Sequence, residues 1–446
     1  MAIKRRDFLK GVAGASGAAL AGSVLGKNLF AHEAEGLTPL PAPEQSGIEN
    51  IVVVMMENRS FDHLLGWMPG ARGRQEGLSY KDRNGVEHPT HRLNSYTGCP
   101  HPDPDHSYEG GRSEYDGGRM DGWLRTSTND EYCIGYYTEE DLKFYAALFR
   151  NYTTLDNYFS STLCSTFPNR IFSWAAQTDR LNNSIKQCTL PTIIDSLQAA
   201  NVGVTYYFNN LPFLALWGTK YTSVSALYDE FLVQAALGLL PPVSFVDPVY
   251  TLTDDGTGND DHPHADLRRG EAFVQHVFNA VTQGPNWDKT VLIVTRDEWG
   301  GFFEHIVPPR VIAPNDVDKD LVKGKALLGC RVPVTIASPF TRGNPEKPRI
   351  NSLLFDHTSV LKLIEWRYSL NPLTKRDASP AIHNLAHAMD FNNPDPSVPS
   401  LPHVTAPKPK ACPGAIINGS ASGKTDSYDL LQVARAQRWR LPAGLP

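Results

Sequence analysis

Acidic and amide side chains follow two strongly apolar segments of this sequence, and together they could hold a metal ion. The apolar segments, 51–55 and 290–294, are typical of buried β-strands. The polar residues that follow them are Glu57, Asn58, Asp297 and Glu298. Ligands bind at the carboxyl ends of the strands in open α/β sheets, so we expect these four side chains to meet. Their oxygen atoms would suit a divalent cation whose identity stays open, although Glu57 and Asp297 could instead only cap the following helix or turn.

A hydroxyl group stands at the expected start of a helix, in the segment Thr166-Phe167-Pro168-Asn169-Arg170. Pro168 suits the first turn of a helix, so Thr166 should lie where free N–H groups and the helix dipole attract a phosphate. A hydroxyl placed there can attack phosphorus when a metal stabilises its alkoxide. Thr166 could equally be an ordinary N-cap, and Ser165 is the next candidate nucleophile.

Strand-like and helix-like segments alternate around these residues. Further strands are predicted over 202–207 and 332–337, and helices from Asp141, after the Thr166 segment within 160–180, and over 270–282, 356–368 and 427–438. The alternation predicts an α/β fold with a doubly wound, mainly parallel central sheet flanked by helices. Residues 68–140 are rich in Gly, Asp, Tyr and Arg and have little periodicity. We expect them to form long loops that cap the active edge.

The composition is that of a globular protein with a large core. The 446 residues are 41% hydrophobic and 20% charged, with a formal net charge of −6. This charge argues against binding to nucleic acid and against strong attraction to anionic lipids. A zwitterionic lipid or a small phosphate ester is easier to accept.

The N-terminus has the features of an export signal. Lys4-Arg5-Arg6-Asp7-Phe8-Leu9-Lys10 precedes an apolar run of small residues, and the segment resembles a twin-arginine signal. We therefore expect residues 1–33 to be a signal peptide that engages the twin-arginine translocon. Residues 34–446 would form a single catalytic domain with a Pro-rich C-terminal tail, located in the periplasm or secreted. The alternative is that the first residues form an N-terminal helix of the fold.

Six cysteines occur at positions 99, 133, 164, 188, 330 and 412, without a C-x-x-C spacing. A cysteine zinc site is therefore not expected. An oxidising compartment permits disulfides, and we expect at least one, although six cysteines allow 15 full pairings.

Six short motifs give the chain a resemblance to a known family. They are Glu57–His63, Asp105-His106, Thr166–Arg170, Asp261–Pro263, Asp297–Gly301 and Asp356–Ser359. The chain resembles the phosphoesterase family of non-specific phospholipases C and acid phosphatases, within the alkaline-phosphatase-like superfamily. The motifs occur in the family's order and span most of the expected mature chain.

The resemblance implies a set of site residues. The catalytic residues would be Thr166, His106, His262 and His357, and the substrate- or phosphate-binding residues Asn58, Arg170, His264 and His305. The metal would be held by Glu57, Asn58, Asp297 and Glu298. Thr166 would displace the alcohol, a histidine would protonate it, and water would cleave the phosphothreonine. For His264 and His305, a satisfied surface or capping histidine is the open alternative.

The resemblance also bears on the substrate. The segment Glu57–Trp67 looks most like that of plant non-specific phospholipases C. We therefore expect cleavage of phosphatidylcholine-like lipids to diacylglycerol and a phosphorylated head group, with transient contact with a membrane surface. The alternative is an acid phosphatase acting on monoesters. Sulfatases carry Cys where this chain has Thr166, and Thr cannot become their formylglycine, which argues against a sulfatase. A non-enzymatic binding protein is also disfavoured, because it would leave the nucleophile and the histidines without a role.

Overall fold

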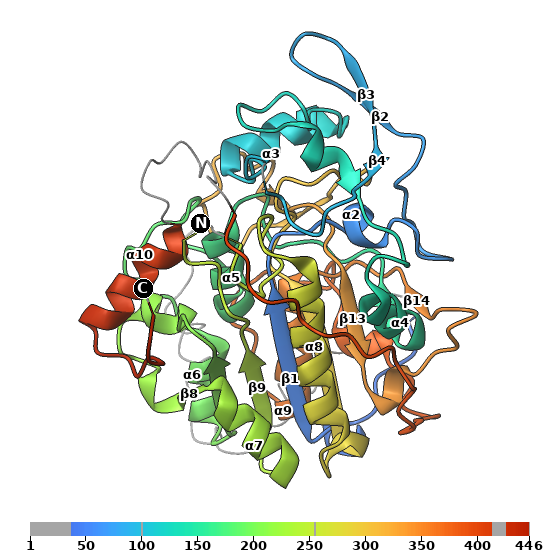
Figure 1. Ribbon diagram of the computed structural model, residues 1–446. Coiled ribbons are helices and arrows are strands. Elements are labelled where there is room, and N and C mark those ends of the chain that lie inside the picture. Colours follow the sequence, from blue (N-terminus) through green and yellow to red (C-terminus); the bar gives the residue numbers. More distant parts are fainter. Residues whose placement is uncertain (1–36, 100, 254–255, 413–424, 446) are drawn as a thin grey trace, which may run out of the picture.

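A mixed, mainly parallel sheet forms the centre of the protein (Figure 1). The computed structural model describes residues 37–99, 101–253, 256–412 and 425–445, so the predicted signal peptide lies outside the described residues. The strand order is β14 (Ile350–Asn351), β6 (Thr153–Leu155), β13 (Val334–Ala337), β10 (Thr290–Arg296), β1 (Asn50–Met56), β9 (Val243–Val246), β7 (Val204–Phe208) and β8 (Ser225–Leu227). The strands from β10 to β8 are parallel, and β13 is antiparallel to both of its neighbours.

Strands β1 and β10 lie side by side because both are apolar on the two faces. Every residue of each strand is buried. Their parallel register pairs Asn50 with Thr290 and Met56 with Arg296. Since the two strands end at the same level, the residues that follow them must come together at the carboxyl edge.

Helices cover both faces of the sheet, as a doubly wound fold requires. Alternate residues of β1 contribute to two separate cores: Ile51 and Val53 to one, Val52 and Val54 to the other. The first core is covered by α5 (Thr166–Ala175), α6 (Ile193–Ala199), α9 (His357–Tyr368) and α10 (Asp426–Ala436). The second is covered by α4 (Lys143–Asn151), α7 (Tyr228–Leu237) and α8 (Leu267–Thr282), with α8 in front of the sheet in Figure 1. The predicted fold class is confirmed.

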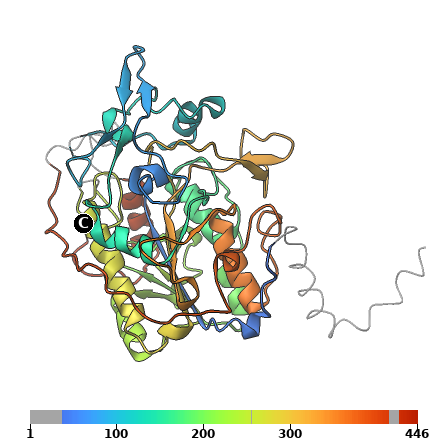
Figure 2. The same ribbon diagram turned by 90° about the vertical axis from the view of Figure 1, so that its right-hand side faces the viewer.

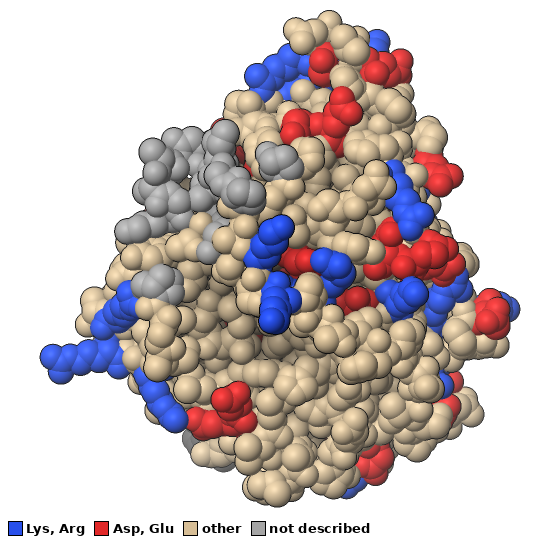
Figure 3. Space-filling view, in the orientation of Figure 1, with Lys and Arg blue, Asp and Glu red and all other residues tan. Residues whose placement is uncertain are grey.

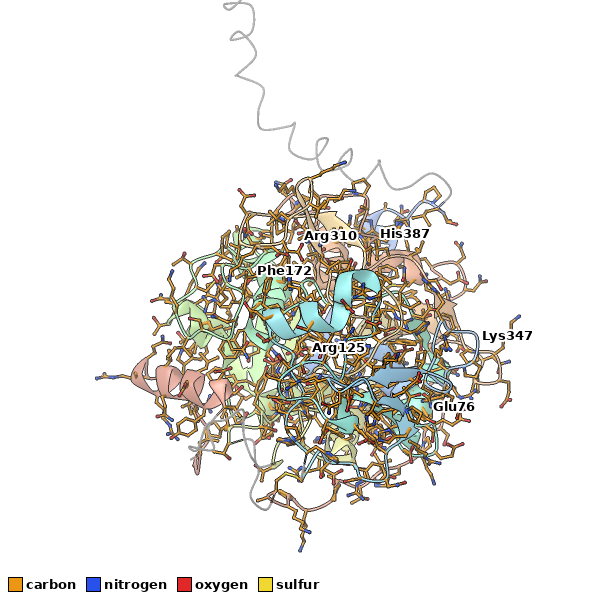
Figure 4. The ribbon with its side chains drawn as sticks, turned by 90° about the horizontal axis from the view of Figure 1, so that it is seen from above. Glu76, Arg125, Phe172, Arg310, Lys347 and His387 are labelled. Carbon is orange, nitrogen blue, oxygen red and sulfur yellow. A yellow bond between two sulfur atoms is a disulfide. The ribbon has the colours of Figure 1, made fainter. Side chains whose placement is uncertain are left out.

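The cap over the carboxyl edge contains short elements as well as loops. They are α2 (Phe61–Leu65), β2 (Ser79–Lys81), β3 (Glu87–Pro89), β4 (His91–Arg92), α3 (Tyr108–Tyr115), β5 (Gly135–Tyr136), β11 (Arg310–Ile312) and β12 (Lys325–Leu327). The β2–β3 hairpin projects from the top of the molecule (Figures 1 and 2). Viewed from above, α3 crosses the centre of the cap, with Arg125 close beside it (Figure 4).

Local capping explains where the predicted helices differ from the observed ones. The helix expected from 270 begins at Leu267, because the side chain of Asp266 accepts a hydrogen bond from Arg268 N. The helix expected over 356–368 has Asp356 as its N-cap. Strands β6, β8, β9 and β14, which have two to four residues each, were not predicted.

A disulfide attaches the C-terminal tail to the cap. Cys99, in the loop before His106, is bonded to Cys412. The expectation of at least one disulfide is confirmed, and the other four cysteines are buried free thiols. None of the helices in the described ranges combines the length and apolar character that crossing a membrane would take.

Candidate active site

The four predicted metal ligands meet at the ends of β1 and β10. Asp297 Oδ1 accepts hydrogen bonds from the backbone N–H of Asn58 at 3.2 Å and of Glu298 at 2.7 Å. Glu298 Oε2 accepts from Gly300 N at 2.7 Å. Asn58, Asp297 and Glu298 are fully buried and Glu57 is 3% exposed. The neighbouring strand ends therefore create one compact oxygen-rich site.

Two glycines allow the loops of this site to approach each other. Gly300 and Gly301 have positive φ angles of 64° and 72°. A Cβ atom on Gly300 would lie 2.2 Å from the carbonyl oxygen of Asn58, and one on Gly301 would lie 2.6 Å from Pro104. Only glycine fits both the backbone conformation and the contact distance.

We call the side-chain oxygens of Glu57, Asn58, Asp297 and Glu298 the oxygen set. Three of these buried oxygens lack the hydrogen-bond partners that buried oxygens normally have. Glu57 Oε1, Asn58 Oδ1 and Glu298 Oε1 are buried without a hydrogen-bond partner among the described residues. Burial and the nearby Asp297 carboxylate raise the pKa of Glu57 well above its usual value. Burial raises the pKa of Glu298 to about 8. A divalent cation would satisfy the unpaired oxygens and stabilise the ionised carboxylates, so the residues fit the expected metal.

Arg170 lies against the carboxylates at the ends of the two strands. Its side chain is 2% exposed, and Nε donates to Asp297 Oδ2 at 3.0 Å and lies 3.6 Å from Glu57 Oε1. Nη1 donates to Asp247 Oδ1 at 3.0 Å, and Nη2 reaches the carbonyl oxygens at the end of β1. All of its nitrogen atoms thus have protein partners, Arg170 supports the carboxylates, and its contact with a phosphate stays a prediction.

Thr166 is the first residue of α5, and Ser165 takes the N-cap position. The Thr166 side chain is 5% exposed, and its hydroxyl has no hydrogen-bond partner in the described part of the chain. Arg170 lies one turn further on the same face of α5 and contacts Asp297, so this face points to the oxygen set. Thr166 is therefore not an ordinary N-cap, and its role as nucleophile stays a prediction.

His106 and His262 adjoin the oxygen set from the cap. His106 Nδ1 hydrogen-bonds with Pro104 O at 2.7 Å, and Nε2 lies 3.3 Å from Asn58 Nδ2 and 3.9 Å from Glu298 Oε1. The His262 ring is 6.4 Å from that of His106, and its Nε2 lies 3.7 Å from Asp103 Oδ2.

The two imidazoles have opposite pKa shifts. Burial alone would lower the pKa of His106, but Glu298 and Asp103 outweigh burial and raise it to about 9. Burial, His106 and His264 lower the pKa of His262 well below its usual value. The pair thus provides one proton donor and one neutral imidazole near pH 7. The sequence analysis missed Asp103, although it stands three residues before His106 in the same polar loop.

Three other predicted histidines have hydrogen-bond partners within the protein. His264 is 1% exposed, with Nε2 2.9 Å from His101 O. His305 Nδ1 bonds with Asp62 Oδ2. His357 is fully buried, with Nε2 2.6 Å from the carbonyl oxygen of Asp297 and Nδ1 3.1 Å from the Tyr158 hydroxyl. Both ring nitrogens of His357 are engaged by the protein, and contact of the three residues with the phosphate stays a prediction.

Two other groups of three residues occur in the described ranges. In each group, the three possible metal-ligand atoms lie within 4.8 Å of one another. One is Asp103, His106 and His262, and the other is Asp62, Glu304 and His305. In the second group Arg331 Nη2 already lies 3.1 Å from Asp62 Oδ1 and 2.8 Å from Glu304 Oε1. Glu57, Asp297 and Glu298 are spread more widely, but their unpaired buried oxygens point more strongly to a cation.

Comparison with known proteins identifies the family of the chain. The sequence profile of the phosphoesterase family matches residues 48–371. The chain is 32% identical to non-specific phospholipase C6 of Arabidopsis thaliana over 371 residues, covering 75% of this chain and 71% of the relative. It is 29% identical to phospholipase C B of Mycobacterium tuberculosis over 501 residues, covering 93% and 91%.

A solved structure of an alkaline phosphatase superfamily protein from Vibrio parahaemolyticus aligns with a TM-score of 0.38 and 9% identity, over 82% of this chain and 77% of the other. That distant alignment adds nothing about activity. The sequence profile and the relatives lead to one conclusion: the chain belongs to the phosphoesterase family and is a hydrolase of phosphoric esters.

Proposed function

We propose that the protein is a phospholipase C that cleaves phosphatidylcholine-like lipids to diacylglycerol and a phosphorylated head group. The observation that carries the proposal is the oxygen set with unpaired buried atoms, faced by a helix N-terminus that starts with Thr166. A phosphate bound there would meet both features at once. The relatives named above are called phospholipases C, which supports a lipid diester as the substrate.

Glu57, Asn58, Asp297 and Glu298 are the residues that would hold a divalent metal ion. When bound, such an ion supplies positive charge that stabilises the phosphate and lowers the pKa of a nearby hydroxyl. Arg170 keeps the carboxylates of Asp297 and Glu57 oriented toward the same place.

The chain's own residues would perform hydrolysis in two steps. Thr166 Oγ1 loses its proton to water and bonds to phosphorus, while the bond from phosphorus to the diacylglycerol oxygen breaks. His106, the imidazole with the raised pKa, donates the proton that the departing oxygen needs. Water then attacks the phosphothreonine, the bond to Thr166 Oγ1 breaks, and the phosphorylated head group leaves.

An acid phosphatase is the second candidate, and the narrow approach to the site favours it. Thr166 is 5% exposed, and the His106 and His262 side chains are 12% and 13% exposed. A small monoester would reach such a site more easily than a lipid would. The same groups would serve either substrate.

We further propose transient contact with a membrane surface. A cavity of about 500 Å³ lies between the C-terminal tail and the start of α8, and it is lined by Lys408, Lys410 and the ion pair of Arg268 with Asp266. Basic side chains gather on this face, where the tail crosses α8 (Figures 1 and 3). The disulfide at Cys99 connects the cavity to the loop that carries His106. Lipid phosphates would be attracted here in spite of the negative net charge.

We also propose export through the twin-arginine translocon to the periplasm or the medium. The support is the sequence of residues 4–10 and the apolar run after it. Replacing Arg5 and Arg6 by Lys should leave folded protein in the cytoplasm. Normal appearance of the mature protein outside the inner membrane would contradict this route.

One assay tests the function directly. Diacylglycerol release from phosphatidylcholine should be compared with phosphate release from a monoester, with and without a chelator. We expect the diester to be preferred and the chelator to abolish the activity. Preference for the monoester would support the acid phosphatase, and full activity in a metal-free preparation would refute the metal site.

A further inference from the structure

We infer that two separate braces hold Asp297 in the orientation that metal binding requires. Tyr206 and Asp247 hold its side chain through Arg170, and Tyr158 holds its main chain through His357. The inference rests on the proposed function, because it treats Asp297 as a metal ligand. It assigns Tyr206, Asp247 and Tyr158 as positioning residues, none of which lies in the six sequence motifs.

The side-chain brace begins at the end of β9. Asp247 follows this strand directly and is 5% exposed. Its Oδ1 accepts from Arg170 Nη1 at 3.0 Å, and its Oδ2 accepts from the Tyr206 hydroxyl at 2.6 Å. Tyr206 is fully buried in β7, and its hydroxyl oxygen in turn accepts from Phe213 N at 2.9 Å. Both oxygens of Asp247 are thus engaged, and the guanidinium is held at a fixed angle.

Arg170 transmits this constraint to two carboxylates at once. Its Nε lies 3.0 Å from Asp297 Oδ2 and 3.6 Å from Glu57 Oε1. The planar guanidinium presents its donors in a rigid fork, so rotation of one end would move the other. Without Asp247, Arg170 could turn and release the two carboxylates, which repel each other in this buried site.

The main-chain brace reaches Asp297 from the opposite direction. His357 is the first residue of α9, and its Nε2 lies 2.6 Å from the Asp297 carbonyl oxygen. A carbonyl can only accept, so Nε2 carries the proton and the neutral ring accepts from the Tyr158 hydroxyl at Nδ1, 3.1 Å away. The carbonyl belongs to the peptide between Asp297 and Glu298. Holding it therefore orients two ligands together.

The side-chain brace can be tested with two substitutions of Asp247. Asp247→Ala removes both hydrogen bonds, whereas Asp247→Asn keeps an acceptor for Arg170 and a polar partner for Tyr206. We expect Asp247→Ala to weaken Mn²⁺ binding, measured by chelator competition, at least tenfold. It should also lower kcat at saturating Mn²⁺ while KM changes less than threefold. Asp247→Asn should restore most of the Mn²⁺ affinity.

Removal of single hydroxyl groups tests both braces without creating a cavity. Tyr206→Phe and Tyr158→Phe should each weaken Mn²⁺ binding about three- to tenfold, as expected for the loss of one buried hydrogen bond. Tyr152→Phe is the matched control, because Tyr152 is fully buried and its hydroxyl has no hydrogen-bond partner in the described ranges. It should leave Mn²⁺ affinity unchanged.

The outcomes separate this inference from the proposed function. If the native protein binds no Mn²⁺, or hydrolyses no phosphate ester with it, the proposed function fails. If the native protein does both and folded Asp247→Ala retains its Mn²⁺ affinity and kcat, the side-chain brace is wrong. If Asp247→Ala does not fold, the two tyrosine variants decide, and affinities equal to that of Tyr152→Phe would overturn both braces.

Discussion

The segments that follow β1 and β10 build two buried carboxylate clusters, and the clusters differ in how their charge is balanced. The first contains Glu57, Asn58, Asp297 and Glu298. The second, only a few residues further along both segments, contains Asp62, Glu304 and His305, with Arg331 between the two carboxylates. Chain position alone does not distinguish them.

The difference lies in the cation each cluster already has. Arg331 lies within 3.1 Å of both carboxylates of the second cluster, and despite burial the pKa of Asp62 is lowered by His305 and Arg331. In the first cluster Arg170 is shared among Asp297, Glu57 and Asp247, while Glu298 Oε1 has no hydrogen-bond partner among the described groups. The second cluster is neutralised by an arginine that contacts both of its carboxylates, so it stabilises the fold, whereas the first keeps unpaired buried oxygens that can bind a metal ion.

The largest expected effect separates the clusters by their metal content. Asp297→Ala should remove bound metal and lower kcat/KM by about 10⁴-fold, because ligand and nucleophile act as a unit. Glu304→Gln, the matched change in the second cluster, should keep the metal content of the native protein. Elemental analysis of both variants after chelation and reloading with Mn²⁺ measures this, and metal loss in Glu304→Gln alone would reverse the two assignments.

Removal of the nucleophile should break the chemistry but leave both clusters intact. Thr166→Ala should fold, retain metal and lose about a thousandfold or more in kcat. Thr166→Ser should keep part of the activity, since the hydroxyl remains. Mass spectrometry after trapping with a slow substrate should locate phosphate on Thr166. Phosphate on Ser165, or inversion at phosphorus, would contradict the two-step mechanism.

Removal of Arg331, the cation of the second cluster, should lower the stability of the folded protein. Arg331→Met leaves the Asp62 carboxylate buried without its arginine counter-charge and Glu304 without its donor, so we expect a loss of about 3–5 kcal/mol in the free energy of unfolding. Denaturant titration measures the loss. The folded fraction should still bind Mn²⁺ with native affinity, and a variant of native stability would show that Arg331 does not neutralise this cluster.

The smallest effect is a pH dependence within the second cluster. Burial raises the pKa of Glu304 to about 8, from 4.5 in the unfolded chain, although Arg331 opposes the shift. The folded state therefore keeps a proton that the unfolded state releases, so this contribution to stability is full below pH 4.5 and is lost as pH rises to 8. The slope is at most about 1.4 kcal/mol per pH unit. Glu304→Gln should flatten the stability curve between pH 5 and 8, and an equally steep curve would refute this.

The sequence was informative about residues next to long apolar strands and less so about contacts between distant segments. β1 and β10 were predictable because the mainly apolar runs 51–55 and 290–294 stand out in the sequence, and they led directly to the oxygen set. Asp247 also follows a strand, but β9 has only four residues and includes the polar Ser244, so no long apolar run marks it in the sequence.

The histidines show a second limit of prediction from the sequence. His106 and His357 both follow an aspartate in the sequence, yet one adjoins the oxygen set and the other bonds to a carbonyl beneath it. The direction of each ring depends on residues such as Tyr158, 199 positions away from His357. Such long-range partners cannot be read from local spacing.

The Cys99–Cys412 disulfide makes most of this protein a closed covalent ring. The bonded residues are 313 positions apart in the chain. Because a cross-link of this span restricts the unfolded chain, chain-entropy arguments predict that it stabilises the folded state by about 5–6 kcal/mol. A single proteolytic cut anywhere between these cysteines would also leave both fragments joined. Loss of the C-terminal tail from the cap therefore requires a reductant or a second cut, and a nicked molecule would run as one species until reduced.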